Sequence, residues 1–129
     1  MSVSDIGCVP TDFAAEWIAA WNAHDLDRVL KHYAPEVEFT SPFVSRLLDN
    51  NENTLRGVAA LRVYFRHALN AYPSLCFVSR GVYVGVRSLV IVYHSVSNLL
   101  AAEVMEFNEA GLVCRVCAHY VTEAAKSKD

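Results

Sequence analysis

The sequence predicts an α+β domain in which helices cover one side of an antiparallel sheet. Apolar residues recur at helical spacing in the first part of the chain, whereas alternating β-rich runs fill residues 75–122. A short turn that contains Gly111 joins the last two of these runs. The predicted order is helix, helix, strand, helix and four strands, and 129 residues fit one domain.

The N-terminal part supplies the first two predicted helices. Residues 1–10 show no periodicity, so we expect a flexible arm there, a single domain over residues 11–122 and a polar tail at 123–129. Thr11 and Asp25 are suited to cap the two helices. Their apolar stripes comprise Phe13, Trp17, Ala20, Trp21, Leu26, Val29, Leu30 and Tyr33.

A strand, a loop and a helix follow. Alternation over residues 37–42 puts Phe39 and Ser41 on one face of the strand. Residues 43–57 are polar in their middle and are predicted to form a loop, either a lid over a cavity or a surface excursion. Residues 58–72 form the third predicted helix, whose apolar stripe ends before a proline.

The C-terminal part is predicted to be a set of curved strands. Residues 75–85 and 88–98 form two of them, and residues 99–122 form a closing hairpin. We expect Phe107 to pair with Leu112 across the turn. The face of the hairpin that is then turned towards the helices comprises Glu103, Met105, Phe107, Leu112, Cys114, Val116, Ala118 and Tyr120.

Glu103 is the residue on that face that needs an explanation. A carboxylate that faces a core is unfavourable unless it is paired, protonated or lines a cavity. A strongly curved sheet closed by helices encloses such a cavity, because short side chains such as Ser41 and Ala118 do not fill it. His119 points the other way on this register, and a shift of one residue would exchange it with Tyr120.

Composition excludes several classes of function. A net charge of −3 with scattered cations predicts no nucleic-acid partner. No apolar run approaches the length of a membrane span. The four cysteines show no disulfide framework. We therefore expect a cytoplasmic protein with free thiols. The absence of a phosphate-binding loop or metal-ligand cluster predicts no cofactor and no metal. A hydrophobic fraction of 53% suggests a lined cavity, a subunit interface or both.

Four segments carry a family resemblance: residues 17–27, residues 37–42, the pair Arg56-Gly57 and residues 107–111. Together they resemble the NTF2-like superfamily, and more narrowly the SnoaL-like proteins, which lie near ketosteroid isomerase. The resemblance implies a cystatin-like α+β cone of three helices on a strongly curved antiparallel sheet, with a hydrophobic ligand pocket. It also implies a homodimer formed through the convex sheet face. This fold hosts isomerases, dehydratases, cyclases, epoxide hydrolases and binding proteins, so it does not by itself define an activity.

Part of the isomerase pattern is missing. Trp17 stands where the isomerase has a tyrosine donor, and Ser41 stands where it has its general-base aspartate. Glu103 matches the second acid of the isomerase. A serine hydroxyl is too weak an acid to shuttle protons as an aspartate does, so isomerisation by that mechanism is not expected. The cyclase pattern places an acid near Ala118, where this chain has no carboxylate.

Glu103 is the principal catalytic candidate, and His119 is the second. Burial would raise the pKa of Glu103 and make it a proton donor or a base. Alternatively, a hydroxyl of Tyr33 or Tyr93, an indole N–H or a subunit contact satisfies the carboxyl. The predicted ligand pocket is lined by Trp17, Trp21, Tyr33, Phe39, Ser41, Phe65, Tyr93, Met105, Val116, Ala118 and Tyr120.

Two functions remain open, and the sequence does not decide whether the protein is an enzyme. The first is binding of a hydrophobic small molecule with cofactor-free acid–base chemistry of the isomerase, dehydratase or cyclase type through Glu103. The second is a non-catalytic small-molecule-binding or dimeric interaction domain. The inward Glu103 favours the first, and the missing base at Ser41 favours the second. A third class, protein recognition of the transport-factor type, requires an exposed apolar patch that the sequence does not identify.

Overall fold

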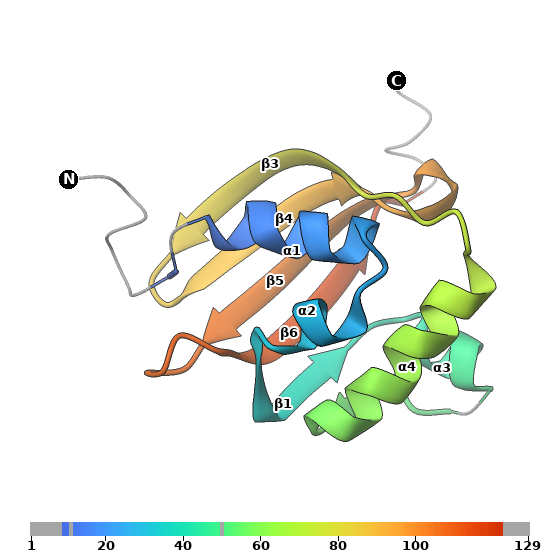
Figure 1. Ribbon diagram of the computed structural model, residues 1–129, viewed down its shortest axis with the longest axis horizontal. Coiled ribbons are helices and arrows are strands. Elements are labelled where there is room, and N and C mark those ends of the chain that lie inside the picture. The colour runs from blue at the N-terminus through green and yellow to red at the C-terminus, as the bar shows by residue number, and fades with distance from the viewer. Residues whose placement is uncertain (1–8, 11, 50, 123–129) are drawn as a thin grey trace.

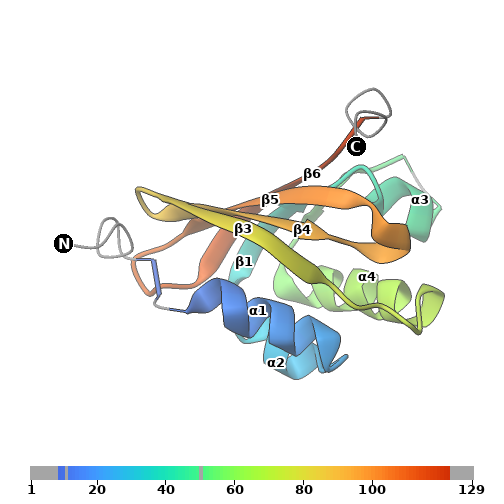
Figure 2. The same cartoon turned by 90° about the horizontal axis from the view of Figure 1, so that it is seen from above.

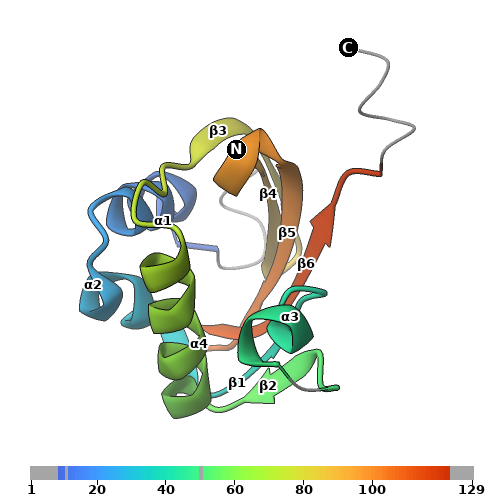
Figure 3. The ribbon, with the colours of Figure 1, turned by 90° about the vertical axis from the view of Figure 1, so that its right-hand side faces the viewer.

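The computed structural model describes residues 9, 10, 12–49 and 51–122. In this part of the chain, a helical layer lies on the concave side of a six-stranded sheet (Figures 1 and 3). Figure 2 shows the two layers from the edge. Thr11 and the predicted tail lie outside the described residues, as does the predicted arm up to residue 8. Val9 is buried in the core.

The helices are α1 (Phe13–Asn22), α2 (Leu26–Leu30), α3 (Val44–Leu48), α4 (Val58–Ala71) and the short 3₁₀ helix η2 (Val96–Asn98). The strands are β1 (Tyr33–Thr40), β2 (Thr54–Arg56), β3 (Val78–Gly85), β4 (Ser88–His94), β5 (Leu100–Phe107) and β6 (Val113–Tyr120). The sequence-predicted α+β class is confirmed. None of the helices in the described part of the chain has the length and apolar character needed to cross a membrane.

The sheet is mixed, so the expectation of a wholly antiparallel sheet is wrong. Its order is β2-β1-β6-β5-β4-β3, and β1 runs parallel to β6 while the other neighbours are antiparallel. Parallel neighbours need a long connection between them. Here that connection is the chain from α3 to β5, which includes the long helix α4.

The second helix ends earlier than predicted, and the first strand begins earlier than predicted, because of local backbone pairing. The side chain of Asp25 caps α2 by accepting from the Arg28 amide at 3.2 Å, as predicted. However, α2 ends at Leu30, and Tyr33 begins β1 instead of completing the helix. Pro35 disfavours a helical conformation just before it, and Tyr33 pairs with Val113 of β6.

The predicted loop at residues 43–57 contains α3 and β2. The five residues of α3 and the three of β2 are too few to show a periodic pattern, so the sequence could not reveal them. The Ser41 hydroxyl accepts from the Phe43 amide at 3.2 Å just before α3. The hydroxyls of Thr40 and Thr54 lie 2.9 Å apart, where β2 pairs with β1. The segment is therefore a structured wall beside α4 and β1.

Away from its turn, the closing hairpin keeps its predicted faces but not its predicted register. Glu103 lies opposite Ala118, whereas pairing of Phe107 with Leu112 would have placed it opposite Val116. Two one-residue displacements add up to this difference: Phe107 pairs with Val113 instead of Leu112, and a bulge between Glu106 and Phe107 shifts the register by one more residue. A displacement of two residues preserves the side-chain alternation.

At the bulged end of the hairpin, Val113 is fully buried in place of the expected Leu112 and Cys114. Asn108 organises the turn, because its side-chain oxygen accepts from the amides of Ala110 and Leu112 at 3.0 Å. Gly111 takes a φ of 79° there, a conformation that favours glycine.

Candidate functional site

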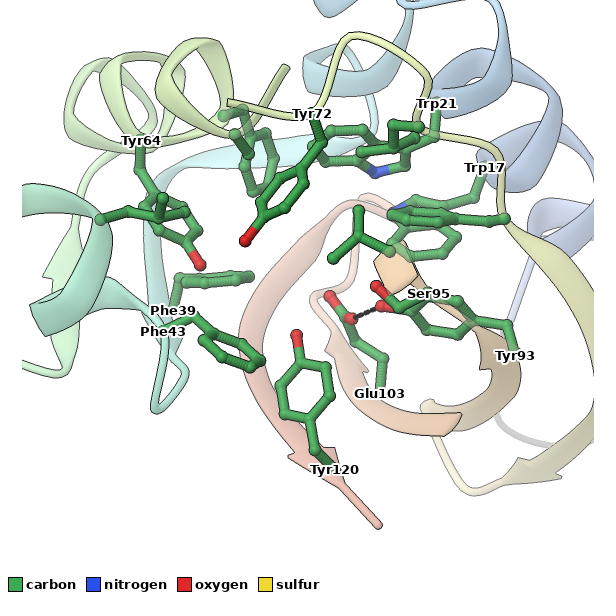
Figure 4. A pocket seen from close by; sticks show the side chains of 16 residues that line it. Trp17, Trp21, Phe39, Phe43, Tyr64, Tyr72, Tyr93, Ser95, Glu103 and Tyr120 are labelled. Carbon is green, nitrogen blue, oxygen red and sulfur yellow. Dashed lines mark hydrogen bonds between the residues drawn. The ribbon is translucent and has the colours of Figure 1, made fainter. Parts of the chain in front are cut away.

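A cavity lies between the helical layer and the concave face of the sheet (Figure 4). It contains about 610 Å³ of empty space, including its open mouth. Most of the residues around it are aromatic: Trp17, Trp21, Phe39, Phe43, Tyr64, Phe65, Tyr72, Phe77, Tyr93 and Tyr120. The others are Leu47, Ala68, Leu75, Ser95, Val96 and Glu103.

Glu103 projects into this cavity from β5 and is only 4% exposed. Its Oε1 accepts a hydrogen bond from the hydroxyl of Tyr93 on β4, at 2.6 Å. Burial raises the pKa of Glu103 to about 7, although the bond from Tyr93 acts in the opposite direction. The bond from Tyr93 is made to one of the two carboxyl oxygens. Near neutral pH this carboxyl can therefore either accept or release a proton in an apolar cavity.

Tyrosine hydroxyls surround the carboxyl. Burial, together with the nearby Glu103 carboxylate, raises the pKa of Tyr93 and Tyr120 above the ordinary value of a phenol. The same two causes, opposed by the Ser41 hydroxyl, raise the pKa of Tyr64 to about 12. The hydroxyls of Tyr64, Tyr72 and Tyr120 point towards the interior in Figure 4. A tyrosine with a raised pKa stays protonated at neutral pH, so it can donate a hydrogen bond to a ligand.

The helical wall carries two tryptophans one turn apart on α1. Trp17 Nε1 donates to the Tyr33 hydroxyl at 2.9 Å, and this hydrogen bond is buried. Trp21 Nε1 is also buried, but it has no acceptor within the described part of the chain. The Trp17 ring stacks on Phe77, with ring centroids 5.7 Å apart.

The segment before β3 is fixed to the C-terminal end of α1. The side chain of Asn22 donates to the Phe77 carbonyl at 2.9 Å and accepts from the Phe77 amide at 2.7 Å. Two residues further along the chain, the Nε2 atom of His24 lies 2.8 Å from the Leu75 carbonyl. These bonds place Leu75 and Phe77 in the cavity wall.

Comparison with known proteins agrees with this architecture. The sequence profile of the SnoaL-like domain matches residues 14–126, which is nearly the whole chain. This chain belongs to the SnoaL-like family. A comparison with curated proteins gave no match.

Solved structures support the family assignment and the fold. A SnoaL-like protein of unknown function from Burkholderia thailandensis is 39% identical, with a TM-score of 0.81, over 86% of this chain and 93% of that one. An NTF2-like protein of unknown function from Cytophaga hutchinsonii is 11% identical, with a TM-score of 0.69, over 92% and 96%. The epoxide hydrolase/cyclase-like enzyme SalBIII of salinomycin pyran ring formation is 15% identical, with a TM-score of 0.67, over 84% and 88%. The last two likenesses show the fold alone.

Many of the predicted site residues line the cavity, but not all of them do. Trp17, Trp21, Phe39, Phe65, Tyr93, Glu103 and Tyr120 line it. Tyr33, Ser41, Met105, Val116 and Ala118 do not, and all five are buried. The hydroxyl of Tyr33 accepts from Trp17. The hydroxyl of Ser41 accepts from the Phe43 amide and also acts on the hydroxyls of Tyr64 and Tyr120, so both polar groups are engaged inside the wall.

The second catalytic candidate, His119, lies outside the cavity. It is exposed on the convex face of β6, and its Nδ1 lies 3.1 Å from the Cys117 carbonyl. Its partner across the sheet is Ala102, a neighbour of Glu103 whose side chain points the opposite way. The structure therefore separates the two catalytic candidates onto opposite faces of the hairpin.

Several lining residues were not predicted. Phe43 and Leu47 come from the unpredicted α3 region, and Leu75, Phe77, Ser95 and Val96 come from segments that flank strands and have no periodicity of their own. Tyr64 and Ala68 lie on the apolar stripe of α4, and Tyr72 follows directly after this helix. These tyrosines were a signal that could have been used, because a core-facing hydroxyl needs a polar partner.

The charge of the cavity limits its chemistry. Among the described residues that line it, Glu103 is the one carboxyl, and lysine, arginine and histidine are absent. Within residues 9, 10, 12–49 and 51–122, no three His, Cys, Asp or Glu side chains gather in a group that could hold a metal. The chemical groups presented to a ligand are therefore aromatic faces, neutral donors and one carboxyl.

Proposed function

We propose that this SnoaL-like protein is an enzyme that transfers a proton on an uncharged, apolar carbonyl compound, with Glu103 as the acid–base group and no cofactor. The single observation that carries the proposal is the buried Glu103 carboxyl, with a pKa of about 7, at the wall of an aromatic cavity. A general base works best when its pKa lies near the working pH. A cavity of aromatic rings without lining cations favours a neutral substrate.

The proposed step is an enolisation. The Glu103 carboxylate takes a proton from a carbon next to the carbonyl, the electrons of that C–H bond form a C=C bond, and the carbonyl oxygen becomes an enolate. Neutral donors, such as the Tyr64 and Tyr120 hydroxyls, stabilise the enolate oxygen. The protonated Glu103 then returns its proton to the same carbon or to a conjugated one. A single carboxyl is sufficient for this cycle, so it does not require a base at Ser41.

Deuterium exchange tests the step without knowledge of the natural substrate. β-Tetralone, an apolar bicyclic ketone, is incubated with the protein in D₂O, and NMR follows the loss of the protons next to its carbonyl. We expect exchange above the buffer rate, and a loss of about a hundredfold or more in Glu103→Gln because the base is removed.

The matched control is Glu106→Gln, an equally conservative change at an exposed position on the other face of β5. This variant should exchange at the wild-type rate. Equal rates for wild type and Glu103→Gln would contradict the proposal.

The second candidate function is binding without chemistry, and one contact favours it. The hydrogen bond from Tyr93 already engages one oxygen of Glu103, as a purely structural carboxyl would require. In that case β-tetralone would bind and raise the melting temperature, but its exchange would stay at the buffer rate in wild type and Glu103→Gln alike.

We also propose a homodimer formed through the convex sheet face. The pairing of the strands aligns Tyr83, Val90, Val104 and Cys117 in one row across this face, and the Tyr83 side chain is 68% exposed. An apolar row on an open sheet face is typical of a subunit interface. Sedimentation velocity tests the proposal, and a monomer at micromolar concentration would contradict it.

A cytoplasmic location is the remaining proposal. The thiols of Cys76, Cys114 and Cys117 are free, which suits a reducing compartment. Fractionation of cells that express a tagged chain tests it, and recovery outside the cytoplasmic fraction would contradict it.

A further inference from the structure

We infer that the indole N–H of Trp21 is the fixed hydrogen-bond donor that holds the carbonyl oxygen of the ligand in this cavity. The inference deepens the proposed function, because it names the group that would receive the oxygen of the substrate while Glu103 handles the proton. It adds to the proposed neutral, apolar ligand the requirement that its carbonyl oxygen reach the helical wall.

The unpaired N–H of Trp21 is the observation that carries the inference. Trp21 is 4% exposed and lines the cavity, yet its Nε1 has no acceptor among the described residues. Buried polar groups in native proteins are nearly always hydrogen-bonded, and an unpaired one is costly. Figure 4 shows the Trp21 nitrogen on the side of its ring that faces the cavity. A ligand acceptor would complete this site.

Two other buried donors of the wall are already engaged within the protein. The Trp17 N–H is bonded to the Tyr33 hydroxyl, and the Tyr93 hydroxyl is bonded to Glu103. A hydroxyl on a tyrosine can rotate to suit its partner, whereas the indole N–H has one direction set by its ring. Trp21 is therefore a donor whose direction is set before a ligand binds.

Packing fixes the Trp21 ring in place. Phe65 meets it edge to face, with centroids 4.7 Å apart and planes at 69°, and Phe77 lies 5.4 Å from it. A donor held in this way needs little reorganisation when negative charge develops on a bound oxygen. Such a donor strengthens its bond as a carbonyl becomes an enolate.

The two polar groups come from opposite layers of the molecule. Trp21 belongs to α1 in the helical layer, whereas Glu103 belongs to β5 in the sheet (Figure 4). A flat ketone between the layers can direct its carbonyl oxygen towards α1 and an adjacent C–H towards β5. This orientation explains how one carboxyl can select one carbon of the ligand.

An NMR titration tests the contact directly. The chain has two tryptophans, so its two indole N–H signals can be assigned from Trp17→Phe and Trp21→Phe. We expect β-tetralone to move the Trp21 signal downfield, as hydrogen bonding does, and to leave the hydrogen-bonded Trp17 signal nearly unchanged. Tetralin, the hydrocarbon without the carbonyl, should not produce the downfield shift. Absence of a ketone-dependent shift at Trp21 would overturn the inference.

A pair of variants provides a second test of the Trp21 contact. Trp21→Phe keeps an aromatic ring but removes the unpaired N–H. The wild type should bind β-tetralone more tightly than tetralin, and the ratio of the two dissociation constants should fall about tenfold in this variant, because one hydrogen bond is lost. Trp17→Phe removes an N–H that the protein itself uses, so it should lower the melting temperature and reduce this preference much less than Trp21→Phe does. An unchanged preference in Trp21→Phe would show that its N–H faces only the neighbouring Phe65 ring, and would overturn the inference.

The two proposals fail in different ways. If Trp21 responds to the ketone but Glu103→Gln exchanges at the wild-type rate, the Trp21 contact stands and the catalytic proposal falls. If Glu103→Gln loses exchange but Trp21→Phe keeps its preference for the ketone, the catalytic proposal stands and the Trp21 contact falls.

Discussion

Glu103 and Glu106 lie on the same strand, β5, but in opposite environments. Glu103 faces the concave side, is 4% exposed and has a pKa raised by burial to about 7. Glu106 faces the convex side, where it is exposed and lies 4.0 Å from the guanidinium of Arg115. The same side chain is thus a candidate acid–base group on one face and a solvated surface charge on the other.

The difference comes from the groups that face each carboxyl. Glu103 sits in a cross-strand row with Val82, Ile91 and Ala118, and it has a tyrosine hydroxyl as its partner. These neighbours offer little solvation, so the neutral form is favoured. Residue type alone therefore does not identify the functional carboxyl of this chain, whereas its face on the sheet does.

The largest contrast between the faces should appear in packing. Met105 on the concave face is fully buried, whereas Val104 beside it on the convex face is half-buried. Met105→Ala should lower the free energy of unfolding by about 2–5 kcal/mol, because it leaves a cavity in the core. Val104→Ala, a smaller truncation on the row proposed to form the dimer interface, should cost the monomer about 1 kcal/mol or less. Urea unfolding at pH 7 measures both values, and equal losses would mean that the convex face is packed as tightly as the core.

The second contrast is in the dependence of stability on pH. The folded protein holds a proton on Glu103 up to about pH 7, whereas an ordinary glutamate loses it near 4.5. The folded state thus binds more protons between these values, and stability should fall as the pH rises through this window, by about 3 kcal/mol in total. Glu103→Gln should remove this fall. Urea unfolding from pH 4.5 to 8 measures it.

The control for this contrast must account for other titrating groups. Burial lowers the pKa of His32, which opposes the effect because it makes stability fall as the pH drops through that range. Arg28 lowers the pKa of Glu16 to about 2, which matters only in more acidic solution. The difference between the wild-type and Glu103→Gln curves isolates Glu103, and Glu106→Gln should follow the wild type. Parallel wild-type and Glu103→Gln curves would mean that the Glu103 carboxyl is solvated in the folded protein.

Sequence reasoning placed Glu103 correctly because a strand alternates strictly between two faces. That alternation survives a register displacement of two residues, so Glu103, Met105 and Tyr120 stayed on the concave side although the expected pairing was wrong. The long helix α4 was predictable for a similar reason, because its stripe repeats over several turns.

Features without a repeat could not be predicted in this way. The bulge at Glu106 and the parallel pairing of β1 with β6 depend on contacts between distant segments. Phe77 and Ser95 enter the cavity from segments outside the regular strands. Spacing also could not show that the N–H of Trp21 is unpaired while that of Trp17 is hydrogen-bonded. Both residues lie on the same helical stripe, and the difference arises because the Tyr33 hydroxyl lies beside Trp17.

The smallest contrast is between His119 and Tyr120, which would exchange faces if the register of the hairpin shifted by one residue. His119 is exposed on the convex face, and Tyr120 lines the cavity. His119→Ala should leave the exchange of β-tetralone at the wild-type rate and change the free energy of unfolding by no more than about 0.5 kcal/mol, because no described contact joins its ring to the cavity. Tyr120→Phe keeps the ring but removes a hydroxyl from the cavity, so it should slow exchange several-fold if that hydroxyl donates to the enolate oxygen. The reverse ranking of the two variants would mean that the hairpin adopts the alternative register in solution, with His119 beside Glu103.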